Sequence, residues 1–252
     1  MIPEVVVLAD PASAAAAAAE RVAAICARTV AARGACAVAL SGGDTPKPLY
    51  ARLAEEPYRR EVPWDRLEVF WGDERCVPPD DARSNFHMAH ETLLAKVSIP
   101  AEHIHRMPAD TVDHEAAARA YAEMLRARLP ATADGWPRFD LILLGIGANA
   151  HVASLFPRTA ALRERNRAVV AELVEDAAMW RMTLTVPVLT RAAAILFLGT
   201  GASKAEAVRA GLEGPADGYD VPAALIRPVD GRVTWILDAA AASRLTGRAG
   251  RV

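Results

Sequence analysis

Short apolar runs alternate with helix-forming stretches along most of this chain of 252 residues. The apolar runs predict strands at Val5–Leu8, Ala35–Leu40, Leu67–Trp71, Phe139–Leu144, Val169–Leu173, Met182–Val186, Ala194–Leu198 and Val233–Leu237. Helices are predicted at Pro11–Ala32, Thr45–Ala54, Asn85–Leu94, Glu115–Leu129 and Ala202–Ala210, followed by a short alanine-rich helix after the last strand. This alternation is typical of an α/β fold with a mostly parallel sheet covered on both faces. No repeat or long linker divides the chain, so we expect one domain over residues 1–252.

The composition is that of a globular chain without a strong net charge. Hydrophobic residues make up 52% and charged residues 24%, and the formal net charge is −2. This balance gives no broad positive surface to attract nucleic acid or membranes, and no apolar stretch reaches the ~18 residues of a membrane span. The start shows no signal-peptide pattern, and Cys26, Cys36 and Cys76 are scattered. We therefore expect a cytoplasmic protein that binds neither nucleic acid nor membranes, of open oligomeric state.

A predicted strand runs directly into a turn rich in glycine. The turn contains Ser41, Gly42, Gly43, Asp44 and Thr45. Thr45 suits the N-cap of the next helix and Pro46 its first position. Glycines let backbone amides approach a ligand, and a helix N-terminus carries partial positive charge, so the turn suits a phosphate. The spacing is not that of a Walker A loop, and a plain strand–helix turn is the alternative.

Three charged residues, Asp73, Glu74 and Arg75, follow another predicted strand almost immediately. In open α/β sheets ligands bind just beyond the carboxyl ends of the strands. We therefore expect this charged group to lie on the same edge of the sheet as the glycine turn. A solvated turn is the simpler interpretation of the three charges alone, and Ser84-Asn85 suits a plain helix N-cap.

His151 stands six residues after Gly145, where the apolar run Leu141–Leu144 ends in a Gly-Ile-Gly turn. An imidazole at the end of such a strand suits a general base near neutral pH. Two other interpretations are open. The series Gly145–Ala150 matches a dinucleotide-binding fingerprint, although Pro157 leaves little room for the helix that this motif requires. A lone histidine is also often a hydrogen-bonded structural residue.

Two cations stand near strand ends in the second half of the chain. Arg181 begins a predicted strand, and Lys204 lies in a Gly-x-x-Lys turn that opens a helix. Arginine binds phosphate through two parallel hydrogen bonds and lysine as a point charge, although surface charges are more often only solvated. His103 and His105 have no carboxylate or cysteine partner at convincing spacing, so we predict no metal site.

Taken together, these segments resemble the bacterial-type 6-phosphogluconolactonases, which share a fold group with the glucosamine-6-phosphate deaminases. The resemblance rests, in order along the chain, on SGGDTPKPLY, WGDERCVPPDDARSNF, FDLILLGIGANAHVASLFP, RMTLTVPVL and GTGASKA. Five ordered segments covering nearly the whole chain are far more specific than one. The resemblance implies a three-layer, Rossmann-like α/β/α sandwich without a cofactor. It also implies hydrolysis of the phosphosugar lactone 6-phosphoglucono-1,5-lactone to 6-phosphogluconate in the pentose phosphate pathway.

Carried over by position, the resemblance gives roles to individual residues. It implies that His151 is the general base and that Asp73 and Arg75 line the sugar ring and lactone. It further implies that Arg181 and Lys204 bind the phosphate. The predicted substrate- and phosphate-binding set is completed by Ser41, Gly42, Gly43, Asp44, Thr45 and Gly147.

The sequence departs from the family pattern beside the histidine. The family usually has Asp-Gly-His where this chain has Asn149-Ala150-His151. An aspartate there orients the imidazole and stabilises imidazolium, whereas Asn149 brings no charge and its amide can select the wrong tautomer. If position 150 needs a positive φ, Ala150 costs on the order of 1 kcal/mol. Asp44 also replaces the usual Ser or Asn, and these departures bear on activity more than on fold.

A lactone is an internal ester, so its hydrolysis needs an activated water, a stabilised oxyanion and a proton for the leaving ring oxygen. His151 is the candidate for both proton transfers, and Arg75 or backbone amides near Gly147 are candidates for the oxyanion site. A glucosamine-6-phosphate deaminase is the nearest alternative, although it typically carries an Asn-Glu pair where this chain has Ser154–Pro157. A phosphosugar-binding protein with weakened catalysis also stays open, and an NAD-dependent dehydrogenase is more distant.

Overall fold

The computed structural model describes residues 2–174, 178–215 and 218–247. Its strands are β1 (Glu4–Leu8), β2 (Cys36–Leu40), β3 (Leu67–Trp71), β4 (Asp73–Arg75), β5 (Leu141–Gly145), β6 (Val169–Val174), β7 (Met179–Leu184), β8 (Ala194–Gly199) and β9 (Arg232–Asp238). Its α-helices are α1 (Pro11–Arg33), α2 (Lys47–Leu53), α3 (Tyr58–Glu61), α4 (Asn85–Thr92), α5 (His114–Arg128), α6 (Val186–Leu189) and α7 (Ala205–Glu213). Short 3₁₀ turns lie between several of these elements.

Six parallel strands form the central sheet in the order β1-β9-β8-β5-β2-β3. The strands β2, β5 and β8 at its centre are almost entirely buried, as their continuous apolar sequences predict for a sheet covered on both faces. The strand β2 lies between β3 and β5, with Val38 opposite both Val69 and Leu141. This register brings the carboxyl ends of three strands from distant parts of the sequence to one edge.

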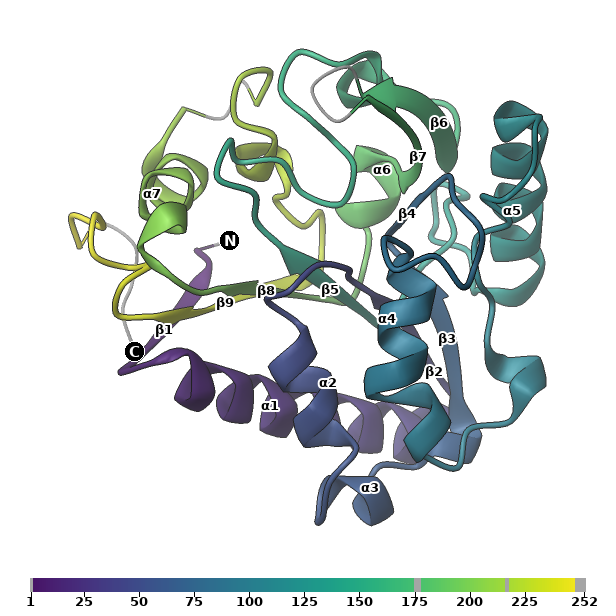
Figure 1. Cartoon of the computed structure of the whole chain (residues 1–252), viewed down its shortest axis with the longest axis horizontal. Helices are drawn as coiled ribbons and strands as arrows, with labels where there is room; N and C mark the ends of the chain where they lie inside the picture. Colours follow the sequence, from purple (N-terminus) through teal and green to yellow (C-terminus); the bar gives the residue numbers. More distant parts are fainter. Residues whose placement is uncertain (1, 175–177, 216–217, 248–252) are drawn as a thin grey trace.

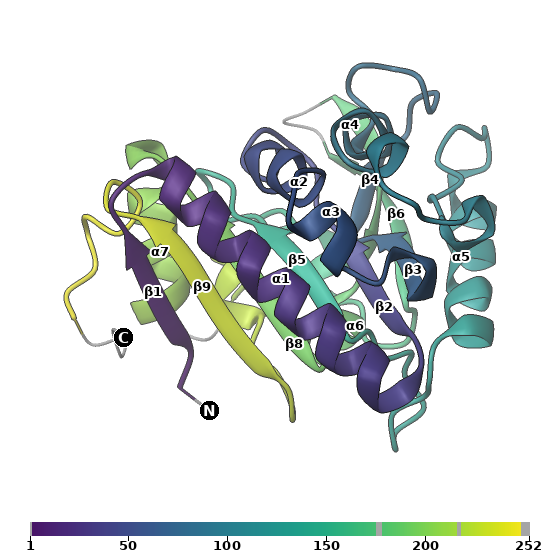
Figure 2. The ribbon, with the colours of Figure 1, turned by 90° about the horizontal axis from the view of Figure 1, so that it is seen from below.

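Helices cover both faces of the central sheet (Figure 1), with α1 and α2 on one side and α6 and α7 on the other. Figure 2 shows α1 running obliquely along its face of the sheet. The alanine run is buried there at Ala14, Ala15, Ala18 and Ala19, and Gly34 ends the helix in the left-handed conformation, as predicted. The predicted three-layer α/β/α arrangement is confirmed. Among the described helices, none is long and apolar enough to cross a membrane.

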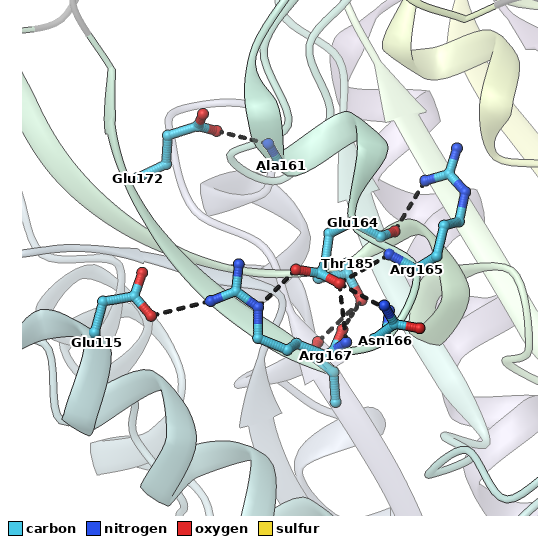
Figure 3. A network of polar contacts seen from close by, with 9 residues as sticks. Glu115, Ala161, Glu164, Arg165, Asn166, Arg167, Glu172 and Thr185 are labelled. Atoms are coloured by element: carbon cyan, nitrogen blue, oxygen red, sulfur yellow. Dashed lines mark hydrogen bonds and ion pairs between the residues drawn. The ribbon is translucent and has the colours of Figure 1, made fainter.

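A second, antiparallel sheet in the order β4-β7-β6 was not predicted. In it, Asp73 pairs with Thr183 and Arg75 with Arg181. The helix α5 packs against β6, beside a polar network that Figure 3 shows. Glu164 accepts the backbone N–H of Asn166 at 2.7 Å and pairs with Arg167 at 2.6 Å, and Arg167 also reaches Glu115 on α5 at 3.1 Å. Glu172 on β6 likewise accepts the backbone N–H of Ala161.

Three local predictions were wrong. The strand predicted at Met182–Val186 is β7, Met179–Leu184, because Pro187 lies in the first turn of the short helix α6. The helix predicted from Thr45 begins at Lys47. Residues 45–46 belong to a turn in which the Lys47 N–H donates to the Asp44 carbonyl. Pro46, not Thr45, is the N-cap, and it has no side chain that can cap the helix. The alanine-rich stretch after β9 forms turns, because a run this short does not sustain a helix.

Candidate functional site

A cavity of about 150 Å³ lies beyond the carboxyl ends of β2 and β5, next to β4 and β7 of the small sheet. Its walls include every predicted site residue except Asn149, namely Ser41, Gly42, Gly43, Asp44, Thr45, Asp73, Arg75, Gly147, His151, Arg181 and Lys204. Four lining residues were not predicted as site residues: Asn85, Gly145, Ile146 and Ala153. Residues from six separate stretches of the sequence therefore converge on one space.

The glycine turn is fixed at its start by Tyr50 of α2. The Ser41 N–H donates to the Tyr50 hydroxyl at 2.9 Å, and this hydroxyl donates to the Ser41 carbonyl at 2.7 Å. The Gly145 N–H of β5 donates to the Ser41 hydroxyl at 3.3 Å, so the turn is joined to two neighbouring elements. Asp44 at the rim pairs with Lys47 at 2.7 Å, and this hydrogen bond lowers the pKa of its largely exposed carboxyl. Lys47 thereby offsets the extra negative charge.

Side chains alternate between the two faces of the short strand β4, and this separates Glu74 from Asp73 and Arg75. Asp73 and Arg75 line the cavity, whereas Glu74 points to the other face and accepts the backbone N–H groups of Asn85 and Phe86 at 2.7 and 2.8 Å. These are the first amides of α4, so Glu74 caps this helix. Burial raises the pKa of the Glu74 carboxyl. Only two of the three charges are therefore available to a ligand.

Three cations converge on the cavity without a carboxylate partner among the described residues. Arg75 and Arg181 lie directly opposite each other in the β4–β7 pair, and Lys204 ends the 3₁₀ helix η6 (Ala202–Lys204). In the described part of the chain none of the three forms an ion pair, and the buried Nε atoms of both arginines have no hydrogen-bond partner. Like charges directly opposite each other are destabilising. With Asp73 as the buried carboxylate beside them, the excess positive charge suits an anion such as phosphate.

The carboxylates of Asp73 and Asp238 accept hydrogen bonds that fix segments carrying residues of this charged site. Asp73 is buried and accepts the Ser154 hydroxyl hydrogen bond at 2.5 Å. Asp238, at the end of β9, accepts the Gly201 N–H at 3.0 Å and thereby fixes the turn that carries Lys204. Neither Ser154 nor Asp238 was predicted, because their roles depend on contacts with residues far away in the sequence.

His151 is held on three sides. Its Nδ1 lies 2.6 Å from Asn149 Oδ1, and its backbone N–H donates to the same oxygen at 3.3 Å. Its ring stacks on Phe156 at 4.2 Å, and a Cβ on Gly147 would lie 2.0 Å from the ring, so only glycine fits there. The backbone N–H of His151 needs a hydrogen-bond acceptor, and of the two amide atoms of Asn149 only the oxygen can accept. The oxygen, not the amide nitrogen, therefore faces Nδ1 of the ring. This assigns the ring proton to Nδ1 and leaves Nε2 with a free lone pair, the opposite of the tautomer problem expected from sequence.

Burial lowers the pKa of His151 to about 4. Asp73 acts in the opposite direction, whereas Arg181, Lys204 and Arg75 each lower the pKa further. The imidazole is therefore neutral at pH 7, which is the form that can accept a proton.

The backbone before His151 forms a tight turn rather than the start of a helix. Ala150 has a φ of +63° and its N–H donates to the Gly147 carbonyl at 3.0 Å, so position 150 does require the left-handed region. The Gly147 N–H donates to the His151 carbonyl at 2.9 Å and is not free for a ligand. After β5 the next helical turn is η4 (Ala160–Arg163), so the helix of a dinucleotide fingerprint is missing from this described segment.

Residues 9–235 match the family model described as glucosamine-6-phosphate isomerases/6-phosphogluconolactonase. The chain is 41% identical over 218 residues to the 6-phosphogluconolactonase of Synechocystis, covering 86% of this chain and 88% of the relative. It is 40% identical over 216 residues to the 6-phosphogluconolactonase of Nostoc, covering 85% and 86%. The solved structure of 6-phosphogluconolactonase from Trypanosoma brucei has a TM-score of 0.86 at 32% identity, covering 97% of this chain and 99% of that one.

Proposed function

Because this chain belongs to the family of glucosamine-6-phosphate isomerases and 6-phosphogluconolactonases, we propose that it hydrolyses 6-phosphoglucono-1,5-lactone to 6-phosphogluconate, a step of the pentose phosphate pathway, with His151 as general base. One observation carries the proposal at the level of the site. A neutral imidazole with a free Nε2 faces the same cavity as three cations that have no carboxylate partner in the described chain. The scattered free cysteines favour a cytoplasmic location, which is part of the proposal.

The phosphate of the substrate binds the cations and the glycine turn. Arg181 and Lys204 supply the charge, and Ser41 to Thr45 supply the wall of the cavity. Hydrogen bonds between charged groups contribute about 1.5–3 kcal/mol each, which is enough to hold the far end of a sugar lactone. This remote binding energy places the reacting carbonyl near His151.

The reaction begins when Nε2 of His151 removes a proton from a water molecule. The resulting hydroxide attacks the lactone carbonyl carbon and forms a tetrahedral oxyanion. The bond from this carbon to the ring oxygen then breaks, and the protonated imidazole returns its proton to that oxygen. The products are a hydroxyl group and an open-chain carboxylic acid, which loses its proton to solvent at neutral pH and becomes the carboxylate. Asn149 holds the ring through Nδ1, so Nε2 stays directed at the reacting atoms.

Arg75 is the better candidate for the oxyanion site. Both it and Gly147 line the cavity, but the Gly147 N–H is already donated to the His151 carbonyl. The Arg75 side chain donates to the Arg83 carbonyl at 2.5 Å, which fixes the guanidinium against the wall of the cavity. A preorganised donor of this kind stabilises developing negative charge without reorganisation.

The two main alternatives are separated by simple assays. Ammonia release from glucosamine 6-phosphate tests a deaminase, and product binding without turnover tests a phosphosugar-binding protein that has lost catalysis. The correctly oriented His151 tautomer favours an enzyme over the second alternative.

The proposal is tested by lactone hydrolysis at neutral pH with spontaneous hydrolysis subtracted. We expect His151→Ala to lower kcat by about 100- to 10,000-fold, because a positioned base contributes that much, while binding of 6-phosphogluconate is retained. His90→Ala, at a half-exposed histidine on α4, is the matched control and keeps the activity. If the wild type hydrolyses the lactone no faster than the spontaneous reaction, the proposed function is wrong. Equal rates in wild type and His151→Ala contradict only the choice of base.

A further inference from the structure

Asn85 begins α4 and is almost completely buried between two parts of the cavity wall. Its amide nitrogen donates to the backbone carbonyl of Asp73 at 2.9 Å and lies 3.3 Å from the Asp73 carboxylate. Both of these partners are acceptors, so the orientation of the amide is unambiguous. The amide oxygen therefore points away from β4.

The amide oxygen of Asn85 lies against Gly42 in the glycine turn. A Cβ built on Gly42 would lie 1.7 Å from this oxygen, so a side chain at position 42 would require the Asn85 amide to move. The oxygen is buried and has no hydrogen-bond partner among the residues that the structure describes. A buried acceptor without a donor is unfavourable by about 1–3 kcal/mol and calls for an explanation beyond helix capping. Ser84, not Asn85, provides the N-cap, since its hydroxyl accepts the His87 N–H.

We propose that Asn85 is a positioning residue, which interlocks with Gly42 and thereby fixes the distance between the phosphate-binding turn and Asp73. One end of the Asn85 amide holds β4, which carries Asp73 and Arg75, and the other end sets the position of the turn. The substrate spans these two parts of the cavity, phosphate at one end and lactone at the other. Asn85 thus makes the cavity fit a lactone of one length. This inference rests on the proposed function.

The interlock is tested with a double-mutant cycle on Gly42→Ala and Asn85→Ala, measuring kcat and KM for 6-phosphoglucono-1,5-lactone. Gly42→Ala places a methyl group where the Asn85 amide lies, so we expect a large rise in KM. Asn85→Ala vacates this space, so adding Gly42→Ala to it has little further effect. We expect the loss in kcat/KM of the double variant to be smaller than the product of the single losses by about 10-fold or more.

Gly43→Ala is the matched control for this cycle. Gly43 lies in the same turn with a φ of +87°, but a Cβ there meets nothing within 4 Å. Its substitution strains the backbone without touching Asn85. We therefore expect the losses from Gly43→Ala and Asn85→Ala to multiply.

Purely multiplicative losses for Gly42→Ala and Asn85→Ala overturn the inference, provided that thermal melting shows folded protein. The same cycle is run with Asn85→Ser where Asn85→Ala does not fold, because serine also vacates the space beside Gly42. A structural role alone lowers the melting temperature without any coupling in kcat/KM that is specific to Gly42. Absence of lactonase activity in the wild type instead contradicts the proposed function, so the two failures are distinguishable.

Discussion

Replacing Asn149 with aspartate puts a negative charge against the ring of His151 without changing the size of the side chain. The oxygen in question lies 2.6 Å from Nδ1, and burial together with Arg181, Lys204 and Arg75 holds the pKa of His151 at about 4. A unit charge at about 4 Å is worth roughly 1 kcal/mol in water and 4 kcal/mol at an effective dielectric constant of 20. Since 1.36 kcal/mol corresponds to one pKa unit, we expect the pKa of His151 to rise by about 1 to 3 units in Asn149→Asp.

The sign of the effect on rate follows from the protonation states. The imidazole must be neutral to remove a proton from water, so activity falls as the pH drops through the pKa of His151. In the wild type this acid limb of kcat/KM is expected near pH 4, and in Asn149→Asp between about pH 5 and 7. At pH values above both acid limbs the variant is expected to be the faster enzyme, because a base with a higher pKa accepts a proton more readily. A Brønsted slope of about 0.5 makes its rate roughly 3- to 30-fold higher than that of the wild type.

The assay is lactone hydrolysis from about pH 3 to pH 8, with the spontaneous rate subtracted at each pH, so that the range includes the limb expected near pH 4. Asn166→Asp is the matched control, because it adds the same charge at an exposed residue outside the cavity (Figure 3). Its acid limb is expected to coincide with that of the wild type. If the acid limb of Asn149→Asp also stays in place, either His151 is not the base or residue 149 does not orient it.

Two further substitutions test the phosphate side. Arg181→Gln is expected to raise KM for the phosphorylated lactone about 10- to 100-fold with little change in kcat, because it removes a charged hydrogen bond made equally in ground and transition states. Initial rates over a range of lactone concentrations measure both constants. An unchanged KM means that the phosphate does not bind Arg181. Tyr50→Phe leaves the Ser41 N–H and carbonyl without their partner. It should lower the free energy of unfolding in urea by about 1–3 kcal/mol, and a stability equal to that of the wild type contradicts the role given to this hydroxyl.

The main sheet could be predicted because its strands are long enough to show a pattern. Runs such as Ala35–Leu40 and Ala194–Leu198 are apolar throughout, and each is followed by a helix-forming stretch. The three residues of β4 are too few to show any period. This strand exists because β7, more than 100 residues later, pairs with it. The positions of Arg75 and Arg181 opposite each other therefore depend on a tertiary contact that no local pattern encodes.

The residues that act through contacts were missed for the same reason. Ser84-Asn85 was interpreted as a helix start, and Ser84 is indeed the N-cap. The contacts of Asn85 with Asp73 and Gly42 become visible only when three segments are assembled. Tyr50 was missed for the same reason. From the sequence alone a tyrosine on a short helix resembles an ordinary core residue, and only the fold shows its hydroxyl bonded to the Ser41 backbone. Residue types indicate the chemistry of the site, whereas its supporting contacts require the fold.

The cations that we propose to bind the phosphate also lower the pKa of the proposed base, and this predicts a pH effect of substrate binding. Arg181, Lys204 and Arg75 lower the pKa of His151 in the free enzyme. A bound phosphate with two negative charges offsets that positive field, so the pKa of His151 is higher in the complex than in the free protein. The acid limb of kcat reports the complex and that of kcat/KM reports the free enzyme. We therefore expect the limb of kcat at the higher pH, and limbs that coincide contradict an electrostatic link between the phosphate site and the base.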